Sequence, residues 1–250
     1  MTQSEGVGMT NYVILNNVEH QNVKVITERS AQYGDNVHFV MTFPTEFRRV
    51  QSSYPIFFQK DANTGKFYPI ALFGFEPNEN LFLGDDGWDA SYVPLMIQRH
   101  PFLIGFQEAQ DEPDAKRSVV SIDLEHSRIS ETEGEALFLP HGGTSEYLAS
   151  MIETLEDIKV GHEMNAKFVD ALLESDLIES VAMEVELNDG SKRQLLGLYT
   201  INEDRLEEID AETLGELNKR QFLLPIYMIL ASYSSFRKLI DKRNERLVEK

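Results

Sequence analysis

Residues 43–106 read FPTEFRRVQSSYPIFFQKDANTGKFYPIALFGFEPNENLFLGDDGWDASYVPLMIQRHPFLIGF, and this stretch decides the fold of the first half of the chain. Aromatic residues, prolines and glycines are denser here than elsewhere, and the stretch holds the only tryptophan, Trp88. Short apolar runs separated by turn-forming residues are typical of strands joined by tight connections. The stretch therefore predicts a rigid, β-rich surface that can hold polar groups in fixed positions.

Two runs inside this stretch give the clearest secondary-structure signal. Tyr54–Gln59 and Lys66–Phe73 are rich in aromatic and β-branched residues. The connector Lys60–Gly65 contains aspartate, asparagine and glycine, so the two runs predict a β-hairpin. Similar patterns predict two further strands and a short helix nearby, at Tyr12–Leu15, Val37–Phe43 and Ala90–Gln98.

The second half of the chain has helical periodicity. Apolar residues recur every three or four positions from Leu148 to Ile158, and Thr144 or Ser145 can cap the helix that they predict. We expect this helix to end near Val160, with Gly161 separating it from a second helix.

An alternating segment follows these helices. Val181–Leu187 alternates apolar and acidic residues, and an Asn-Asp-Gly turn connects it to Arg193–Ile201, which predicts a second hairpin. The remaining helices are expected after Asn202, over Ala211–Lys219 and as one long helix over Phe222–Glu249.

The best candidate for an internal boundary is the polar, acidic segment Glu108–Arg117. We expect residues 1–10 to be a flexible N-terminus and residues 11–250 to form a single domain. The predicted fold class is α+β. A β-rich N-terminal lobe, residues 11–107, would pack with a C-terminal lobe of helices plus a β-hairpin, residues 118–250.

Composition excludes several classes of function. The net charge of −19 disfavours nucleic acid and anionic lipid as partners, because both require clustered basic residues. The chain has no cysteine, which removes disulfides, thiol nucleophiles and iron–sulfur clusters. We see no signal peptide and no transmembrane segment, so no membrane insertion is expected. The cytoplasm is the default location, and export to the cell surface without a signal stays open.

A metal site is one candidate for chemistry. Asp123, Glu125 and His126 lie within four residues of one another. A two-histidine, one-carboxylate iron site built on Asp123 and His126 would need a further histidine, from His100, His141 or His162. The zinc-protease pattern H-E-x-x-H is incomplete, since Ala166 stands where its second histidine is required. The nucleotide-binding glycine loops are missing too, and no cofactor is predicted.

A recognition cleft is the other candidate site. We expect Glu46, Asn80, Trp88, Tyr92 and Arg99 to line it. In this hypothesis Asn80 exchanges hydrogen bonds with a ligand, and the two aromatic rings of Trp88 and Tyr92 stack on it. Glu46 and Arg99 supply complementary charge. A protein or peptide partner fits such a surface.

Short motifs shared with a known protein family run from about residue 12 to residue 244. The motifs are Glu46, Tyr54-Pro55-Ile56, Gly74, Glu79-Asn80-Leu81-Phe82, Gly87-Trp88, Tyr92-Val93-Pro94, Pro101-Phe102, Leu187-Asn188-Asp189-Gly190, Leu196-Gly197-Leu198-Tyr199, Ser232 and Phe236-Arg237-Lys238-Leu239-Ile240. On these motifs the chain resembles the SapC family of bacterial proteins, named for genes associated with surface-layer arrays. Ala231 departs from the family pattern, in which many relatives carry a polar residue before the serine.

The resemblance implies an association with the surface layer or the cell envelope. It also implies a genomic setting near outer-membrane receptors, cupin-like proteins and halogenase-like proteins. We therefore expect a non-enzymatic accessory or binding protein. The alternative is a metal-dependent oxidative modifying enzyme of the 2-oxoglutarate and iron type, acting on a peptide or a small molecule.

Overall fold

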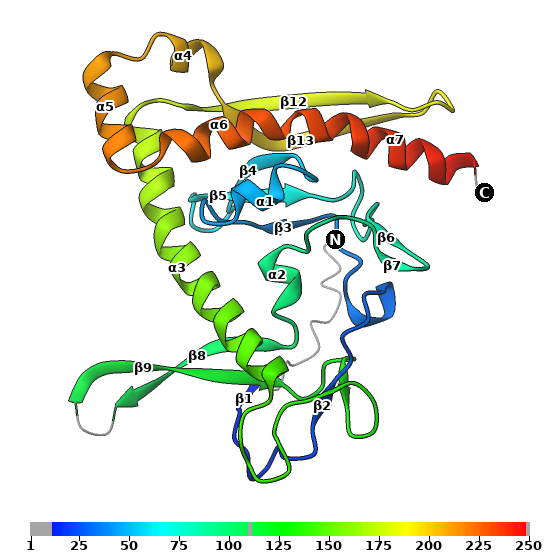
Figure 1. Ribbon diagram of the computed structural model, residues 1–250. Helices are drawn as coiled ribbons and strands as arrows, with labels where there is room; N and C mark the ends of the chain where they lie inside the picture. Colours follow the sequence, from blue (N-terminus) through cyan, green and yellow to red (C-terminus); the bar gives the residue numbers. More distant parts are fainter. Residues whose placement is uncertain (1–11, 110–111, 249–250) are drawn as a thin grey trace.

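The computed structural model describes residues 12–109 and 112–248, and its fold is α+β, as the sequence predicts (Figure 1). A five-stranded antiparallel sheet forms its centre, with the strand order β12-β13-β4-β5-β3. The strands are β3 (Phe39–Met41), β4 (Ile56–Lys60), β5 (Phe67–Leu72), β12 (Ile178–Glu186) and β13 (Lys192–Ile201). The expected flexible N-terminus, residues 1–10, lies outside the described residues.

The central hairpin β4–β5 is confirmed where the sequence predicts it. The carboxylate of Asp61 accepts hydrogen bonds from the backbone amides of Asn63 and Thr64, at 3.0 and 2.6 Å, which fixes the turn. Gly65 closes the turn with φ at 70°, a conformation that favours glycine. Phe57 packs against Phe236 of the C-terminal helix and its neighbour Phe58 against Phe168 of the long helix, so helices cover both faces and most side chains of the two strands are buried.

One long helix, α3 (Glu146–Glu174), connects the sheet to the lower part of the molecule (Figure 1). Ser145 caps it, as predicted, by accepting a hydrogen bond from the amide of Leu148 at 3.1 Å. The expected break at Gly161 is wrong, because the helix runs through this residue. Gly161 marks a close approach instead, since the ring of Phe43 occupies the space that a side chain would need.

A second hairpin occupies the segment that we expected to be the internal boundary. β8 (Phe102–Ala109) pairs with β9 (Glu112–Asp123), and β1 (Tyr12–Ile14) adds to the other side of β9. The apolar cluster beneath this hairpin joins Phe102, Ile122 and Leu148, so it draws residues from both sides of the expected boundary. The division into two lobes stays a prediction.

The C-terminal part packs against the central sheet. The predicted hairpin β12–β13 and the predicted helices α4 (Glu203–Glu207) and α5 (Ala211–Lys219) are confirmed. The single terminal helix is wrong, because two helices, α6 (Leu223–Ser232) and α7 (Ser234–Val248), meet at Tyr233. There the hydroxyl of Ser232 accepts from the amide of Ile56 at 2.8 Å and donates to the carbonyl of Ile229 at 2.6 Å, which fixes the junction to β4.

The remaining elements are short and lie mostly below the sheet. They are β2 (Lys24–Val25), η1 (Ala31–Tyr33), α1 (Phe47–Val50), β6 (Leu83–Gly84), β7 (Gly87–Trp88), α2 (Leu95–Gln98), β10 (Ile129–Ser130) and β11 (Glu135–Ala136). Among the helices described, none combines the length and the apolar character that crossing a bilayer requires.

Candidate functional site

Glu46 and Tyr92, two of the five predicted cleft residues, are in contact. Glu46 is only 1% exposed. One of its oxygens accepts from the hydroxyl of Tyr92 at 2.8 Å and from the amide of Leu95 at 3.2 Å, and the other accepts from the hydroxyl of Thr42 at 2.8 Å. Burial raises the pKa of Glu46, and these hydrogen bonds oppose the shift. The side chain of Glu46 is therefore engaged by the protein itself.

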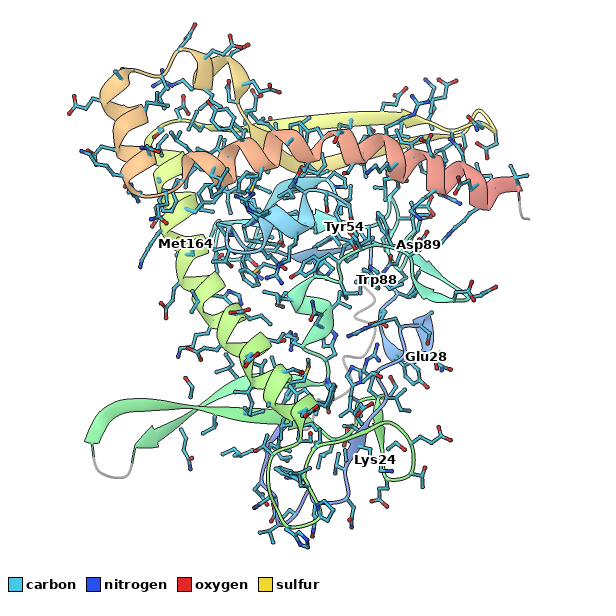
Figure 2. All side chains as sticks on the ribbon, viewed as in Figure 1. Lys24, Glu28, Tyr54, Trp88, Asp89 and Met164 are labelled. Atoms are coloured by element: carbon cyan, nitrogen blue, oxygen red, sulfur yellow. The ribbon has the colours of Figure 1, made fainter. Side chains whose placement is uncertain are left out.

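Trp88 joins the same cluster through Tyr54. The indole Nε1 donates to the hydroxyl oxygen of Tyr54 at 2.7 Å, and the Tyr54 hydroxyl donates to the backbone carbonyl of Tyr92. Phe73 meets the rings of both Tyr54 and Trp88 edge-on. Figure 2 labels Tyr54 and Trp88, which lie in the body of the molecule below α7. These aromatic rings contact one another, so in this structure they act as packing between β4, β7 and the segment before α2.

Asn80 lies in a different buried cluster. Its amide donates to the backbone carbonyl of Asp35 at 2.8 Å, and its oxygen accepts from the amide of Phe82 at 3.0 Å. The carboxylate of Asp35 in turn accepts from the guanidinium of Arg128 at 2.5 Å, with both side chains almost completely buried. Arg29 adds a second, longer contact to the same carboxylate at 3.4 Å. This cluster ties the segment around Asp35 to the loop that carries Arg128.

The Asp35–Arg128 pair was not predicted from the sequence. Arg128 also donates to the backbone carbonyls of Ile26 and Glu28, at 2.8 and 2.6 Å. The guanidinium therefore supplies hydrogen bonds to a segment that continues beyond the end of β2. The pattern around Arg128 predicts only a polar loop, and 93 residues separate the two charges. Nothing local in the sequence indicates that such a loop arginine is buried.

Arg99, the fifth predicted residue, lies in neither cluster but lines a groove between α2 and α3. We call this groove the α2–α3 groove. It consists of two hollows, of about 630 and 450 Å³, which share Met96, Arg99 and His162. The larger hollow is lined by Phe39, Val40, Met41, Asp61, Thr64, Lys66, Phe67, Tyr68, His100, Asn165 and Ala166 besides the shared residues, and the smaller by Leu103, Ile104, Leu155, Ile158, Lys159 and Glu163.

The floor of the groove holds a polar atom that has no partner. Pro69 pairs with Thr42 across β5 and β3, and proline has no amide hydrogen to give to the Thr42 carbonyl. The side-chain amide of Asn165 donates to that carbonyl instead, at 3.0 Å. Its Oδ1 is then left without a hydrogen-bond partner among the described residues, although Asn165 is 7% exposed. Asn165 lines the larger hollow, so this unsatisfied acceptor lies close to a space that a ligand can enter.

Arg99 provides the charge in this groove. One guanidinium nitrogen donates to the carbonyl of Phe102 at 2.9 Å, whereas Nε is buried without a partner in the described part of the chain. Burial lowers the pKa of Arg99 and the hydroxyl of Tyr12 opposes that shift, but an arginine remains charged at neutral pH. The groove thus offers a cationic donor, an amide acceptor and apolar walls.

The histidines beside the groove are neutral at pH 7. Burial, together with Arg99 and His126, lowers the pKa of His100 to about 3, and burial also lowers the pKa of His162. The rings of His100 and His126 stack at 5.6 Å between their centroids. In His126, Nδ1 accepts from the amide of Arg128 at 3.1 Å.

The proposed metal ligands are not assembled into a metal site within residues 12–109 and 112–248. No three histidine, aspartate or glutamate side chains of this part are grouped so that they could hold an ion. Asp123 is buried, and its carboxylate accepts from the amide of Glu125 at 3.1 Å, which is a turn contact. Asp123 and His126 thus have structural partners in this geometry.

The buried carboxylate of Glu46 leads to a prediction about stability. Because its pKa is raised above the ordinary value of 4.5, the charged form destabilises the folded protein as the pH rises above that value. Glu46→Gln is expected to be more stable than the wild type at pH 7.5, by a margin that shrinks as the pH falls toward 5. Urea unfolding of both proteins across this range measures the margin, and parallel pH profiles would contradict the prediction.

The comparisons with known proteins agree with the resemblance in the motifs. The family model described as SapC matches residues 15–239, which is most of the chain. No curated protein matches the chain, and no solved structure matches it. The match includes the central sheet, the α2–α3 groove and both buried clusters. The chain therefore belongs to the SapC family.

Proposed function

We propose that this protein is a non-catalytic binding protein that holds a ligand in the α2–α3 groove and serves as an accessory to surface-layer or cell-envelope processes. The observation that carries the proposal is the unpartnered Oδ1 of Asn165 in the groove floor. An unsatisfied buried acceptor costs about 1–3 kcal/mol, and a ligand that donates to it recovers part of this energy. Family membership supports the setting in the envelope.

The ligand that fits has three parts. An N–H group meets Asn165, an anionic group meets the guanidinium of Arg99, and an apolar body lies on Met96, Leu155 and Ile158. Charge-assisted hydrogen bonds to a guanidinium contribute about 1.5–3 kcal/mol each, so Arg99 is the residue whose loss is felt most. The alternative, an oxidative enzyme with Asp123 and His126 as ligands, stays a prediction that this geometry does not favour.

N-decanoylglycine is a simple probe for this proposal, because it combines an apolar chain, one amide N–H and one carboxylate. Isothermal titration calorimetry is expected to show binding to the wild type. Arg99→Met is expected to weaken it about tenfold or more, equivalent to 1.4 kcal/mol. Asn165→Leu is expected to weaken binding as well, provided that circular dichroism shows a folded protein.

The matched control changes an arginine in the same way at a remote site. Arg237 on α7 is 82% exposed and pairs with Asp241, far from the groove lining, so Arg237→Met is expected to bind the probe as the wild type does. Wild-type binding that is undetectable at about 1 mM probe would reject the groove as a ligand site. Equal binding by Arg99→Met and the wild type would also reject it.

A further inference from the structure

Helix α6 exposes an apolar face although it lies on the surface of the molecule. Residues 221–236 carry no charge. The inner face of α6 is buried on the central sheet through Ile226 and Ile229. On the outer face, Leu224 and Tyr227 are each 53% exposed. A surface helix normally carries polar residues on its outer face, so this apolar face marks a contact surface for another molecule.

The exposed residues form one stripe. Leu224, Tyr227, Met228 and Ala231 recur at intervals of three and four positions, which places them side by side along α6. The backbone groups in the middle of a helix bond within the helix, so the stripe can be bound only through side chains. A second helix packs on such a stripe by interlocking its own side chains with it.

A hollow of about 460 Å³ opens beside the first turn of the stripe. Its apolar lining includes Pro44, Phe222, Leu224 and Met228, and Met164, labelled in Figure 2, lines it from α3. The lining shares no residue with the α2–α3 groove. One large apolar side chain fits such a hollow, and anchors of this kind contribute much of the binding energy of an interface.

Positive charge borders the stripe on the side of α1. Arg48 is the one charged residue among the described residues that line the hollow, and Arg49 follows it on α1. Lys238 on α7 donates to the carbonyl of Ser52, just beyond α1, at 3.3 Å. These three basic side chains are exposed, and none has an ion-pair partner within residues 12–109 and 112–248. In a chain with a net charge of −19, unpaired cations beside an apolar stripe favour an acidic partner.

The other side of α6, toward α4 and β12, has the opposite charge (Figure 1). Burial raises the pKa of Tyr233, and the nearby carboxylates of Glu203 and Glu179 raise it further. Acidic groups of a partner are therefore favoured on the α1 side alone. A membrane rich in anionic lipid would meet these two glutamates as well, which disfavours it as the occupant.

We propose that the outer face of α6 docks an amphipathic helix of a partner protein, which inserts one apolar side chain into the hollow and sets acidic residues against Arg48 and Lys238. This partner is separate from the ligand of the α2–α3 groove, so the inference goes beyond the function proposed above. The apolar contacts supply most of the affinity, and the ionic contacts set the orientation of the bound helix.

The test begins with a display library of helical peptides that favours neither sign of charge. Positions along the seam draw on leucine, phenylalanine, methionine and alanine, and positions on both edges draw equally on glutamate, lysine and glutamine. Peptides selected on the full chain are resynthesised with a fluorescent label, and their affinities are measured by anisotropy. We expect the enriched peptides to carry glutamate on one edge and to bind the wild type with a Kd below about 100 μM.

Two variants then locate the bound peptide. Leu224→Ser removes an apolar wall of the hollow and is expected to weaken binding about tenfold or more. Arg48→Glu is expected to weaken binding about tenfold, and a peptide in which lysine replaces the facing glutamate is expected to recover part of the loss. Both residues are exposed, and circular dichroism checks that the variants are folded.

Lys192→Glu is the matched control for the charge reversal. Lys192 is 58% exposed at the turn between β12 and β13, and no described residue of this hairpin lines the hollow. Its substitution is therefore expected to leave peptide binding unchanged.

Several results would overturn the inference. They include a library that enriches no peptide, enrichment of lysine on both edges, and equal binding by Leu224→Ser and the wild type. A wild type that dimerises in sedimentation velocity while Tyr227→Ser stays monomeric would make a second copy the occupant. Tyr227-dependent flotation with vesicles of phosphatidylcholine and phosphatidylglycerol in equal parts would make a membrane the occupant. Binding of N-decanoylglycine by these variants tests the α2–α3 groove separately, because they leave its lining intact.

Discussion

Arg128→Met is expected to lower the free energy of unfolding by about 3–5 kcal/mol, the effect of breaking a buried ion pair from one side. The substitution leaves the carboxylate of Asp35 completely buried without its main partner, since Arg29 contacts it only at 3.4 Å. It also leaves the carbonyls of Ile26 and Glu28 without a donor. Urea unfolding followed by tryptophan fluorescence measures the loss, with Trp88 as the only reporter.

A surface ion pair provides the control for this change. Arg220 contacts Glu174 at 3.1 Å, and both side chains are well exposed. Exposed pairs contribute about 0–1 kcal/mol, and the other contacts of Arg220, with the carbonyl of Lys167 and the ring of Phe222, involve no buried charge, so Arg220→Met is expected to cost far less than Arg128→Met. If Arg128→Met costs no more than Arg220→Met, the buried pair does not stabilise this fold.

Gly161→Ala is expected to destabilise the protein by about 1–3 kcal/mol through overpacking. A Cβ at this position would lie 2.5 Å from Cγ of Phe43, and Phe43 is fully buried. The ring cannot move away easily, because it packs with Leu95 and Ile158 in a small apolar cluster. Either α3 or the ring must shift, and the lining of the α2–α3 groove shifts with it.

Gly215→Ala is the matched control, and the opposite sign is expected. Gly215 lies in α5, and nothing stands within 4 Å of a Cβ built there. Replacing an unhindered helical glycine by alanine stabilises by about 0.5–1 kcal/mol. Thermal unfolding of the two variants compares them directly, and a stabilised Gly161→Ala would show that the contact with Phe43 relaxes without loss.

Local sequence signals predicted the local structure of this protein. The turn at Asp61 and Gly65, the cap at Ser145 and the alternation in Val181–Leu187 all gave the right elements, because each depends on neighbours within a few residues. Gly161 misled the prediction, since glycine is read as a helix breaker unless a distant ring requires it.

Of the five predicted cleft residues, Arg99 lines the α2–α3 groove. The others do not, because contacts between residues far apart in the sequence decide where each side chain lies. Contacts between Glu46 and Tyr92 span 46 residues, and the contact of Asn165 with Thr42 spans 123. Composition can indicate that polar and aromatic residues gather, but it cannot indicate which hydrogen bonds they make with one another. Asn165 escaped notice because its role depends on the missing amide hydrogen of Pro69, a pairing that appears only when β3 meets β5.

The two edges of the central sheet also limit how copies of this protein can assemble. A sheet grows from molecule to molecule only when one open edge meets another that accepts it. The exposed glutamates along β12 disfavour strand addition on that side, and α2 packs against β3 on the other. Growth of the central sheet from one copy to the next is therefore disfavoured at both of its edges.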